Sequence, residues 1–228
     1  MDAAGTVMND HDSLAIRACT AADVAAAVPL IHDSGPIAFR YVFSHRHQAQ
    51  SLEFLRAAFV DGEGEFGFRN HVVAERAGAV IAVAALWDAR ANLRFTVAAA
   101  RQILGFYRTA APAVIMRGLR MERVVKPAAA GVAYIGHVAV APALRGQGAG
   151  RALLGHLLGR ARNEGYAHAA LDVAATNPRA RALYEGLGFR TVATRRSALQ
   201  GPWGRVPDHH YMVLDLGSER WHGGTPGI

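Results

Sequence analysis

A strand, a glycine-rich turn and a helix follow one another directly over residues 134–162, and this succession constrains the fold more than any other stretch. The apolar run 134–140 predicts a strand, and Ala141-Pro142 predicts the turn that ends it. Residues 145–150 read Arg-Gly-Gln-Gly-Ala-Gly, and apolar residues at helical spacing follow them. Glycine lets a ligand approach the backbone, and the first helical turn carries unpaired N–H groups at the positive end of the helix dipole. The segment therefore predicts an anion site, most naturally for phosphate.

The glycine pattern by itself is compatible with more than one structure. A dinucleotide-binding fingerprint needs an acidic residue about 20 residues further on, and Asp172 lies at roughly that distance. A plain strand-to-helix turn that uses glycine for its geometry is the other interpretation. A Walker loop is excluded, because no Lys-Ser or Lys-Thr pair follows the glycines.

A second motif lies downstream, where residues 176–190 read Thr-Asn-Pro-Arg-Ala-Arg-Ala-Leu-Tyr-Glu-Gly-Leu-Gly-Phe-Arg. Together with Arg145-x-x-Gly148-x-Gly150, this motif resembles the GNAT family, the Gcn5-related N-acetyltransferases that use acetyl-CoA. The resemblance covers residues 132–192 closely and the flanking segments more loosely. Both motifs occur in the family's order and at about its usual separation.

The resemblance implies a mixed α/β (α+β) fold of the GNAT type. Its central sheet is twisted, mostly antiparallel and made of six to seven strands, with helices on both faces and a V-shaped splay between strands 4 and 5. The patterns predict strands over 14–18, 71–75, 79–87, 132–140, 169–173, 189–195 and 210–216, and helices over 20–30, 50–60, 96–107, 113–123, 148–164 and 177–188. Ser34-Gly35-Pro36 predicts a break after the first helix.

We expect one acetyltransferase domain over residues 13–217, between a flexible leader (1–12) and a flexible tail (218–228). A helical insertion occupies about 90–130, where family members usually pass quickly from strand 3 to strand 4. The insertion either only packs on the sheet or forms a lid or substrate-selecting wall.

The resemblance also implies where coenzyme A binds. The main chain of Val138 and Val140 would hold the pantetheine arm in the splay, and the amides of residues 145–150 would hold the pyrophosphate. Arg145 and Arg151 are candidates for phosphate contacts or simply solvated arginines, and Asn177 either contacts the coenzyme or caps the helix it opens. The full set expected at the coenzyme is Val138, Ala139, Val140, Arg145, Gly146, Gln147, Gly148, Ala149, Gly150, Arg151, Asn177 and Tyr184.

The reaction that the resemblance implies is direct transfer of an acetyl group to an amine. Tyr184 matches the family's tyrosine near the thioester sulfur, where it would protonate the departing thiolate; the alternative is a half-buried aromatic residue. A backbone N–H near Val138 would stabilise the oxyanion. Many relatives carry an acid or histidine at the position of Gly136. His137 is the adjacent candidate for a base or relay, although strand alternation would turn it to the opposite face.

Weaker candidates complete the site. Glu75 and His210 are further possible bases, and the aromatic residues Tyr41, Phe43, Trp87 and Trp203 either line an acceptor pocket or only pack. The neighbouring histidines at 45, 47, 209 and 210 do not predict a metal site, because adjacent strand residues do not converge on one ion. Acetyl-CoA is thus the expected co-substrate, without a metal.

The composition of the chain limits the classes of function that remain. The net charge is +7, which fits either a nucleic-acid binder or an enzyme for the polyanion coenzyme A. The arginines are scattered, so we expect no nucleic acid.

Cys19 is the single cysteine, which excludes a disulfide framework, and we expect it in the core. Residues 1–5 do not resemble a signal peptide, and no apolar stretch spans a bilayer, so we expect a cytoplasmic enzyme without membrane contact. Its partner would be a small-molecule or peptide amine, a homodimer stays open, and a catalytically impaired CoA-binding sensor is the alternative function.

Overall fold

One sheet organises the chain in the computed structural model, which describes residues 14–217. The strands of the sheet are β1 (Ala15–Ala18), β2 (His71–Arg76), β3 (Ala79–Trp87), β4 (Val132–Val140), β5 (His168–Ala174), β6 (Arg190–Arg195) and β9 (His209–Asp215). Their order is β1-β2-β3-β4-β5-β9-β6. The leader and tail expected from the sequence lie outside the described residues.

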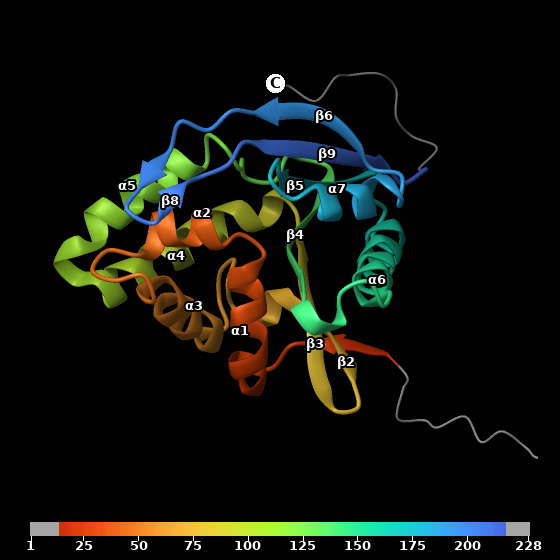
Figure 1. Ribbon diagram of the computed structural model, residues 1–228, viewed down its shortest axis with the longest axis horizontal. Coiled ribbons are helices and arrows are strands. Elements are labelled where there is room, and N and C mark those ends of the chain that lie inside the picture. Colours follow the sequence, from red (N-terminus) through yellow and green to blue (C-terminus); the bar gives the residue numbers. More distant parts are fainter. Residues whose placement is uncertain (1–13, 218–228) are drawn as a thin grey trace, which may run out of the picture.

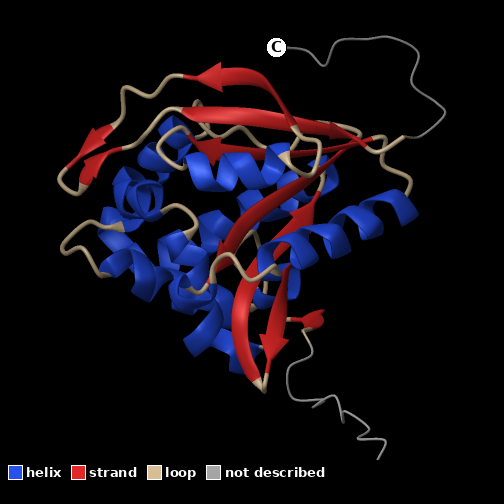
Figure 2. Cartoon of the chain, turned by 45° about the vertical axis from the view of Figure 1, so that its right-hand side comes forward, coloured by secondary structure: helices blue, strands red, loops and turns tan. Residues whose placement is uncertain are grey.

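The predicted splay lies in the middle of this sheet. Neighbouring strands are antiparallel except for β4 and β5, which run parallel and pair only from Val132↔His168 to Tyr134↔Ala170. Beyond Tyr134 the two strands separate, so the sheet divides into two arms that run in different directions (Figure 1, Figure 2). The mixed fold with a mostly antiparallel sheet and a splay after the fourth strand is therefore confirmed.

Helices cover both faces of the sheet. They are α1 (Val24–Asp33), α2 (Pro36–Phe43), α3 (Gln50–Asp61), α4 (Asn92–Tyr107), α5 (Ala111–Met121), α6 (Ala149–Asn163) and α7 (Pro178–Glu185). Helices α1 to α5 gather on one side of β4, and α6 lies on the other (Figure 1). The predicted apolar stripe of α6 is buried against the sheet, with Leu153, Leu154 and Leu157 each 0 % exposed. Burial of this kind stabilises a fold by about 1.5–3 kcal/mol per leucine.

Two parts of the fold differ from the sequence prediction. Ser34-Gly35-Pro36 does end α1, but the chain immediately begins α2, because a proline in the first helical turn lacks only an N–H that has no helical partner anyway. Between the predicted strands 189–195 and 210–216, where no element was predicted, the chain forms a small hairpin, β7 (Gln200–Gly201) and β8 (Gly204–Arg205).

The insertion consists of α4 and α5, as predicted, and these two helices pack on each other and on α2. Its inner face is buried through Phe95, Ile103, Tyr107 and Val114. The Tyr107 hydroxyl donates a hydrogen bond to the carbonyl of Phe43 at the end of α2. The insertion is therefore a fixed part of the structure on the α1–α5 side of the sheet.

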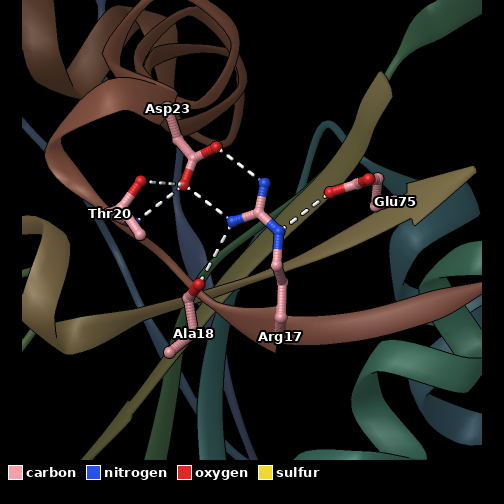
Figure 3. A network of polar contacts seen from close by, with 5 residues as sticks. All are labelled: Arg17, Ala18, Thr20, Asp23 and Glu75. Carbon is pink, nitrogen blue, oxygen red and sulfur yellow. Dashed lines mark hydrogen bonds and ion pairs between the residues drawn. The ribbon is translucent and has the colours of Figure 1, made fainter. Parts of the chain in front are cut away.

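An arginine ties the first strand to the first helix (Figure 3). Arg17 of β1 donates to both carboxylate oxygens of Asp23 at 2.8 Å and to Glu75 of β2 at 2.8 Å. The backbone N–H of Thr20 donates to Asp23 at 2.7 Å, so Asp23 also completes a capping box with Thr20. Hydrogen bonds from Arg17 lower the pKa of Asp23 to about 2.

This pKa shift predicts an acid-sensitive contribution to stability. The pKa of Asp23 is lower in the folded chain than the ordinary 3.8, so its stabilisation is complete above about pH 4 and is lost as the pH falls towards 2. We expect Asp23→Asn to lower the free energy of unfolding by on the order of 1–2 kcal/mol at pH 7, because the exposed Arg17 is partly screened by water. Asp33→Asn, which removes a carboxylate without an arginine partner, is the control. Equal effects of the two variants in urea unfolding at pH 7 would contradict the assignment.

Candidate active site

A cavity of about 830 Å³ lies where β4 and β5 separate. Its wall includes residues 135–140 of β4 and 172–174 of β5. One end reaches the glycine turn and the start of α6 and α7, and the other end reaches α2 and the insertion helices α4 and α5. The edge of β4 that faces β5 is unpaired along this stretch, so its main-chain groups are available to a ligand.

The glycine turn has the geometry of an anion cradle. Gly146 and Gly148 have φ angles of 86° and 85°, in the left-handed region that favours glycine. Gly148 directly precedes α6, whose N-terminal amides and dipole favour negative charge. A Cβ at Gly150 would lie 3.3 Å from Cγ2 of Val140, so this glycine allows the helix to begin close to the strand.

Three arginines surround the cradle. Arg145 donates to the carbonyl of Val140 at 3.0 Å, and Arg151 donates weakly to the carbonyl of Gly186 at 3.4 Å. Arg179, which the sequence analysis did not single out, places Nη2 3.1 Å from where a Cβ of Gly146 would be. None of the three pairs with a carboxylate among residues 14–217. This end of the cavity is therefore strongly positive and fits a polyphosphate.

The structure brings nearly all of the expected coenzyme residues into one wall. Val138, Ala139, Val140, Arg145, Gly146, Gly148, Ala149, Gly150, Arg151, Asn177 and Tyr184 line the cavity, together with His137. The side chain of Gln147 is instead turned towards β2, where Arg76 donates to it at 2.8 Å. Asn177 accepts a hydrogen bond from the amide of Ala180 at 3.1 Å, so it caps α7 while lying in the wall.

Tyr184 of α7 is buried, with 6 % of its surface exposed. Burial raises the pKa of its phenol to about 12, so the hydroxyl stays protonated at neutral pH. The hydroxyl has no hydrogen-bond partner within the described part of the chain, and the residue lines the cavity. Tyr184 therefore presents a proton that is free to be donated.

A bulge in β4 determines which residue takes the place of the missing acid. Gly136 pairs with Ala85 and Ala139 with Val83, so His137 and Val138 together oppose only Ala84. His137 has φ 55°, which breaks the alternation of side chains along the strand. Its ring faces Phe39 and Phe66, on the α1–α5 side of the sheet, rather than α6. The bulge thus turns His137 into the cavity, which regular alternation would not do.

Position 136 has no room for a side chain. A Cβ there would lie 2.2 Å from Cη2 of Trp87, far closer than carbon atoms can approach. The Trp87 ring also contacts His137, with ring centroids 5.5 Å apart. The absence of an acid at Gly136 is therefore a consequence of packing, and His137 occupies the space beside it.

His137 belongs to a chain of polar contacts. Its Nδ1 lies 3.0 Å from Nε2 of His71, whose Nδ1 lies 2.9 Å from the carbonyl oxygen of Gly67. Burial lowers the pKa of His71 to about 3, which keeps this ring neutral with one N–H. A carbonyl oxygen only accepts, so the N–H of His71 is on Nδ1 and its Nε2 accepts from His137.

The consequence for His137 is a defined tautomer. Its Nδ1 carries the proton that is donated to His71, and its Nε2 lies 3.4 Å from Oε1 of Glu65. Neither His71 nor Glu65 was identified from the sequence. His71 lies 66 residues before its partner, and only the sheet brings the two together.

Asp172 of β5 has a structural role that differs from the ribose ligand of a dinucleotide fold. It accepts hydrogen bonds from the Tyr134 hydroxyl at 2.9 Å and from Arg195 at 2.9 Å. Burial raises its pKa to about 6 despite these two partners. The mostly antiparallel sheet removes the dinucleotide interpretation of the glycine turn.

Other candidates lie outside the cavity wall. Glu75 is paired with Arg17, and His210 contacts the Thr194 hydroxyl at 2.9 Å, so neither is placed to act as a base. Among the four aromatic candidates Phe43 lines the cavity, whereas Tyr41, Trp87 and Trp203 do not. Cys19 is buried, and burial raises its pKa to about 12.

The described part of the chain contains neither a metal-binding cluster nor a membrane-spanning helix. Residues 14–217 contain no cluster of three or more histidine, cysteine, aspartate or glutamate side chains that could hold a metal ion. Over the same residues, every helix is too short or too polar to cross a membrane.

Known proteins resemble this chain in both sequence and fold. The profile of the acetyltransferase (GNAT) family matches residues 38–189. The [ribosomal protein bS18]-alanine N-acetyltransferase of Escherichia coli K12 is 46% identical over 61 residues, which are 27% of this chain and 41% of that enzyme. The chain therefore matches less than half the length of the curated relatives.

Solved structures share the fold at low sequence identity. A GCN5-related N-acetyltransferase from Kribbella flavida has a TM-score of 0.54 and 23% identity, covering 89% of this chain and 97% of that one. A putative acetyltransferase from Salmonella typhimurium, solved with its cofactor acetyl-CoA, has a TM-score of 0.53 and 21% identity, covering 93% and 99%. Since the family profile spans well over half of the residues, from α2 through the glycine turn to the end of α7, this chain belongs to the acetyltransferase (GNAT) family.

Proposed function

We propose that this protein is an acetyl-CoA-dependent N-acetyltransferase that transfers an acetyl group directly from coenzyme A to an amine. The observation that carries the proposal is a single cavity that connects three parts. These are a positive glycine cradle, the unpaired edge of β4 and the imidazole of His137. A cytoplasmic location belongs to the same proposal and is tested by cell fractionation.

The residues present fit coenzyme A. The amides around Gly146 and Gly148, with Arg145, Arg151 and Arg179, would hold the pyrophosphate. The pantetheine arm would lie along residues 135–140, whose free edge accepts an extended ligand much as a sheet accepts another strand. The acetyl group would then lie between His137 and Tyr184, which both line the cavity.

Each chemical step has a candidate residue. Bound acetyl-CoA supplies the thioester carbonyl that the amine attacks, forming a C–N bond and breaking the C–S bond. Nε2 of His137 accepts the proton that the amine loses. The N–H of Val138 donates to the carbonyl oxygen as negative charge develops. Tyr184 donates its proton to the sulfur, which leaves as a thiol.

A CoA-binding sensor without catalysis is the alternative function. The feature that favoured it was Gly136 in place of an acid. The Trp87 ring occupies the space that a side chain at position 136 would need. The imidazole of His137 lies beside that ring. Release of free thiol in a single turnover, with acetyl-CoA and a panel of amines, separates the two functions: a sensor binds acetyl-CoA but releases none.

Acetyl-CoA is expected to raise the melting temperature through the glycine cradle. At about 100 times the dissociation constant, binding adds about 2.7 kcal/mol by mass action, which is several degrees for a chain of this size. Gly148→Glu should abolish this shift, because its carboxylate would repel phosphate. Gly78→Glu is the matched control, since Gly78 also has a positive φ (74°) and open space, but lies in the β2–β3 turn. A normal shift in Gly148→Glu would place the phosphate site elsewhere.

Tyr184→Phe is expected to lower kcat by about 10²-fold while coenzyme affinity changes by no more than a few-fold. The substitution removes a proton donor and little packing, because the hydroxyl has no partner among the described residues. Tyr166→Phe serves as the control, since its hydroxyl bonds to Asp88 outside the cavity. Unchanged turnover in Tyr184→Phe, with chemistry shown to be rate-limiting, would remove Tyr184 from the mechanism.

His137→Ala is expected to lower kcat/KM by about 10²-fold or more and to abolish the rise of kcat/KM with pH that a general base produces. His71 acts through His137, so His71→Phe should move the midpoint of that rise. His71→Gln should restore the midpoint, because an amide can donate to Gly67 and accept from His137. Identical pH profiles for wild type and His71→Phe would show that His71 is only a packing residue.

A further inference from the structure

The cavity wall is divided by charge. The arginines in the wall, Arg145, Arg151 and Arg179, all lie around the glycine cradle. The opposite end carries the carboxylates of Asp33, Glu65 and Glu122, and no arginine or lysine of the described chain lines that end. A chain with a net charge of +7 thus has a local excess of negative charge at its acceptor end. The electrostatic potential is therefore positive where the coenzyme's phosphates would bind and negative at the opposite end of the cavity, where the acceptor would bind.

Two of these carboxylates form no ion pair with an arginine or lysine among the described residues. Glu65 is 41% exposed, and its carboxylate lies 3.4 Å from Nε2 of His137. Glu122 follows α5 and forms no salt bridge within residues 14–217. Burial, and secondly the negative charge of Glu65, raises the pKa of Glu122. Two carboxylates in one cavity wall repel each other, and a cation between them would relieve that repulsion.

The remaining wall at this end is apolar. Phe39 and Phe66 place their rings 6.0 and 5.4 Å from the His137 imidazole, measured between centroids. The insertion contributes Ala100 and Ile103 from α4 and Ile115 from α5. Aromatic faces accept both apolar groups and cations. The insertion therefore lines this end of the cavity.

We propose that the acceptor is a small cationic amine with an apolar body of about the size of one aromatic ring and without a carboxylate or phosphate. Glu65 and Glu122 bind its ammonium group, and the phenylalanines with α4 and α5 enclose its body. The ammonium loses one proton to water, and Nε2 of His137 accepts the second as the nitrogen attacks and the C–N bond forms. This inference rests on the proposed function and specifies its substrate class.

Size and charge together support a small molecule. The cavity of about 830 Å³ has to hold the pantetheine arm as well as the acceptor, and 300–1,000 Å³ is the ordinary range for a small-ligand pocket. A carboxylate on the acceptor would approach Glu65 and Glu122 directly, and like charges brought together at an interface cost several kcal/mol. A free amino acid is therefore rejected, although it carries the same ammonium group.

The first test compares 2-phenylethylamine with phenylalanine, which differ by one carboxylate. With saturating acetyl-CoA and full-length protein, release of free thiol should give a kcat/KM at least about 10²-fold higher for 2-phenylethylamine. A short peptide with N-terminal alanine should react no better than phenylalanine. Equal or better activity with phenylalanine or with the peptide overturns the proposal.

Variants of the wall provide an independent test. Glu122→Gln should raise KM for 2-phenylethylamine by about 10-fold with kcat within about 3-fold, and should narrow the discrimination against phenylalanine. Glu164→Gln is the matched control, because Glu164 pairs with Arg160 on the surface of α6, away from the cavity. Ala100→Phe should lower kcat/KM for 2-phenylethylamine more than for ethylamine, because it shortens the apolar part of the site. Unchanged KM in Glu122→Gln together with unchanged size preference in Ala100→Phe overturns the assignment.

A binding measurement separates this inference from the proposed function. Calorimetric titration of 2-phenylethylamine into the CoA-saturated protein should give binding that phenylalanine does not. Absence of binding at millimolar amine, in protein whose melting temperature rises with acetyl-CoA, overturns the acceptor class alone. Absence of the acetyl-CoA shift itself overturns the proposed function.

Discussion

The contact between the Trp87 ring and the backbone of Gly136 is the constraint on which the catalytic half of the cavity depends. The ring occupies the space of a side chain at residue 136, so any larger residue there would have to displace it, and β4 continues past Gly136 through a bulge. The bulge brings His137 to the same face as the ring. Since β4 and β5 stop pairing just before this point, the same stretch combines an unpaired strand edge with the imidazole of His137.

The backbone of His137 is strained, and its surroundings hold it there. A left-handed φ costs a residue with a Cβ roughly 1–2 kcal/mol. Four rings surround the imidazole, those of Phe39, Phe66, His71 and Trp87, and the hydrogen bond to His71 fixes its orientation. Strain at this position is therefore offset by packing and by a buried hydrogen bond. The imidazole of His137 is therefore held in one orientation by a strand of the sheet and its neighbours.

The coenzyme half of the site was predictable because it is local in sequence. The glycine turn, the start of α6 and the Asn177 cap are each formed by residues within a few positions of one another, and the prediction of family and fold is confirmed. The orientation of His137 was not predictable, since regular strand alternation could turn it away and the bulge appears only in the pairing of β4 with β3. Glu75 and His210 failed as bases for a similar reason. Their positions on strands looked suitable, but Arg17 and Thr194 hold them elsewhere.

The acceptor half contrasts with the coenzyme half in how it is assembled. Its wall comes from α2, from the loop that holds Glu65, and from α4 and α5, which are separated by long stretches of chain. No short sequence motif identifies a surface that is assembled from distant elements. The net charge of +7 over 228 residues also does not indicate that one end of the cavity is acidic. Coenzyme A presents the same phosphates to every enzyme that uses it, so its site can be built from a recurring local motif. An acceptor differs from enzyme to enzyme, so selectivity for it arises where distant elements meet, as they do between the insertion and α2.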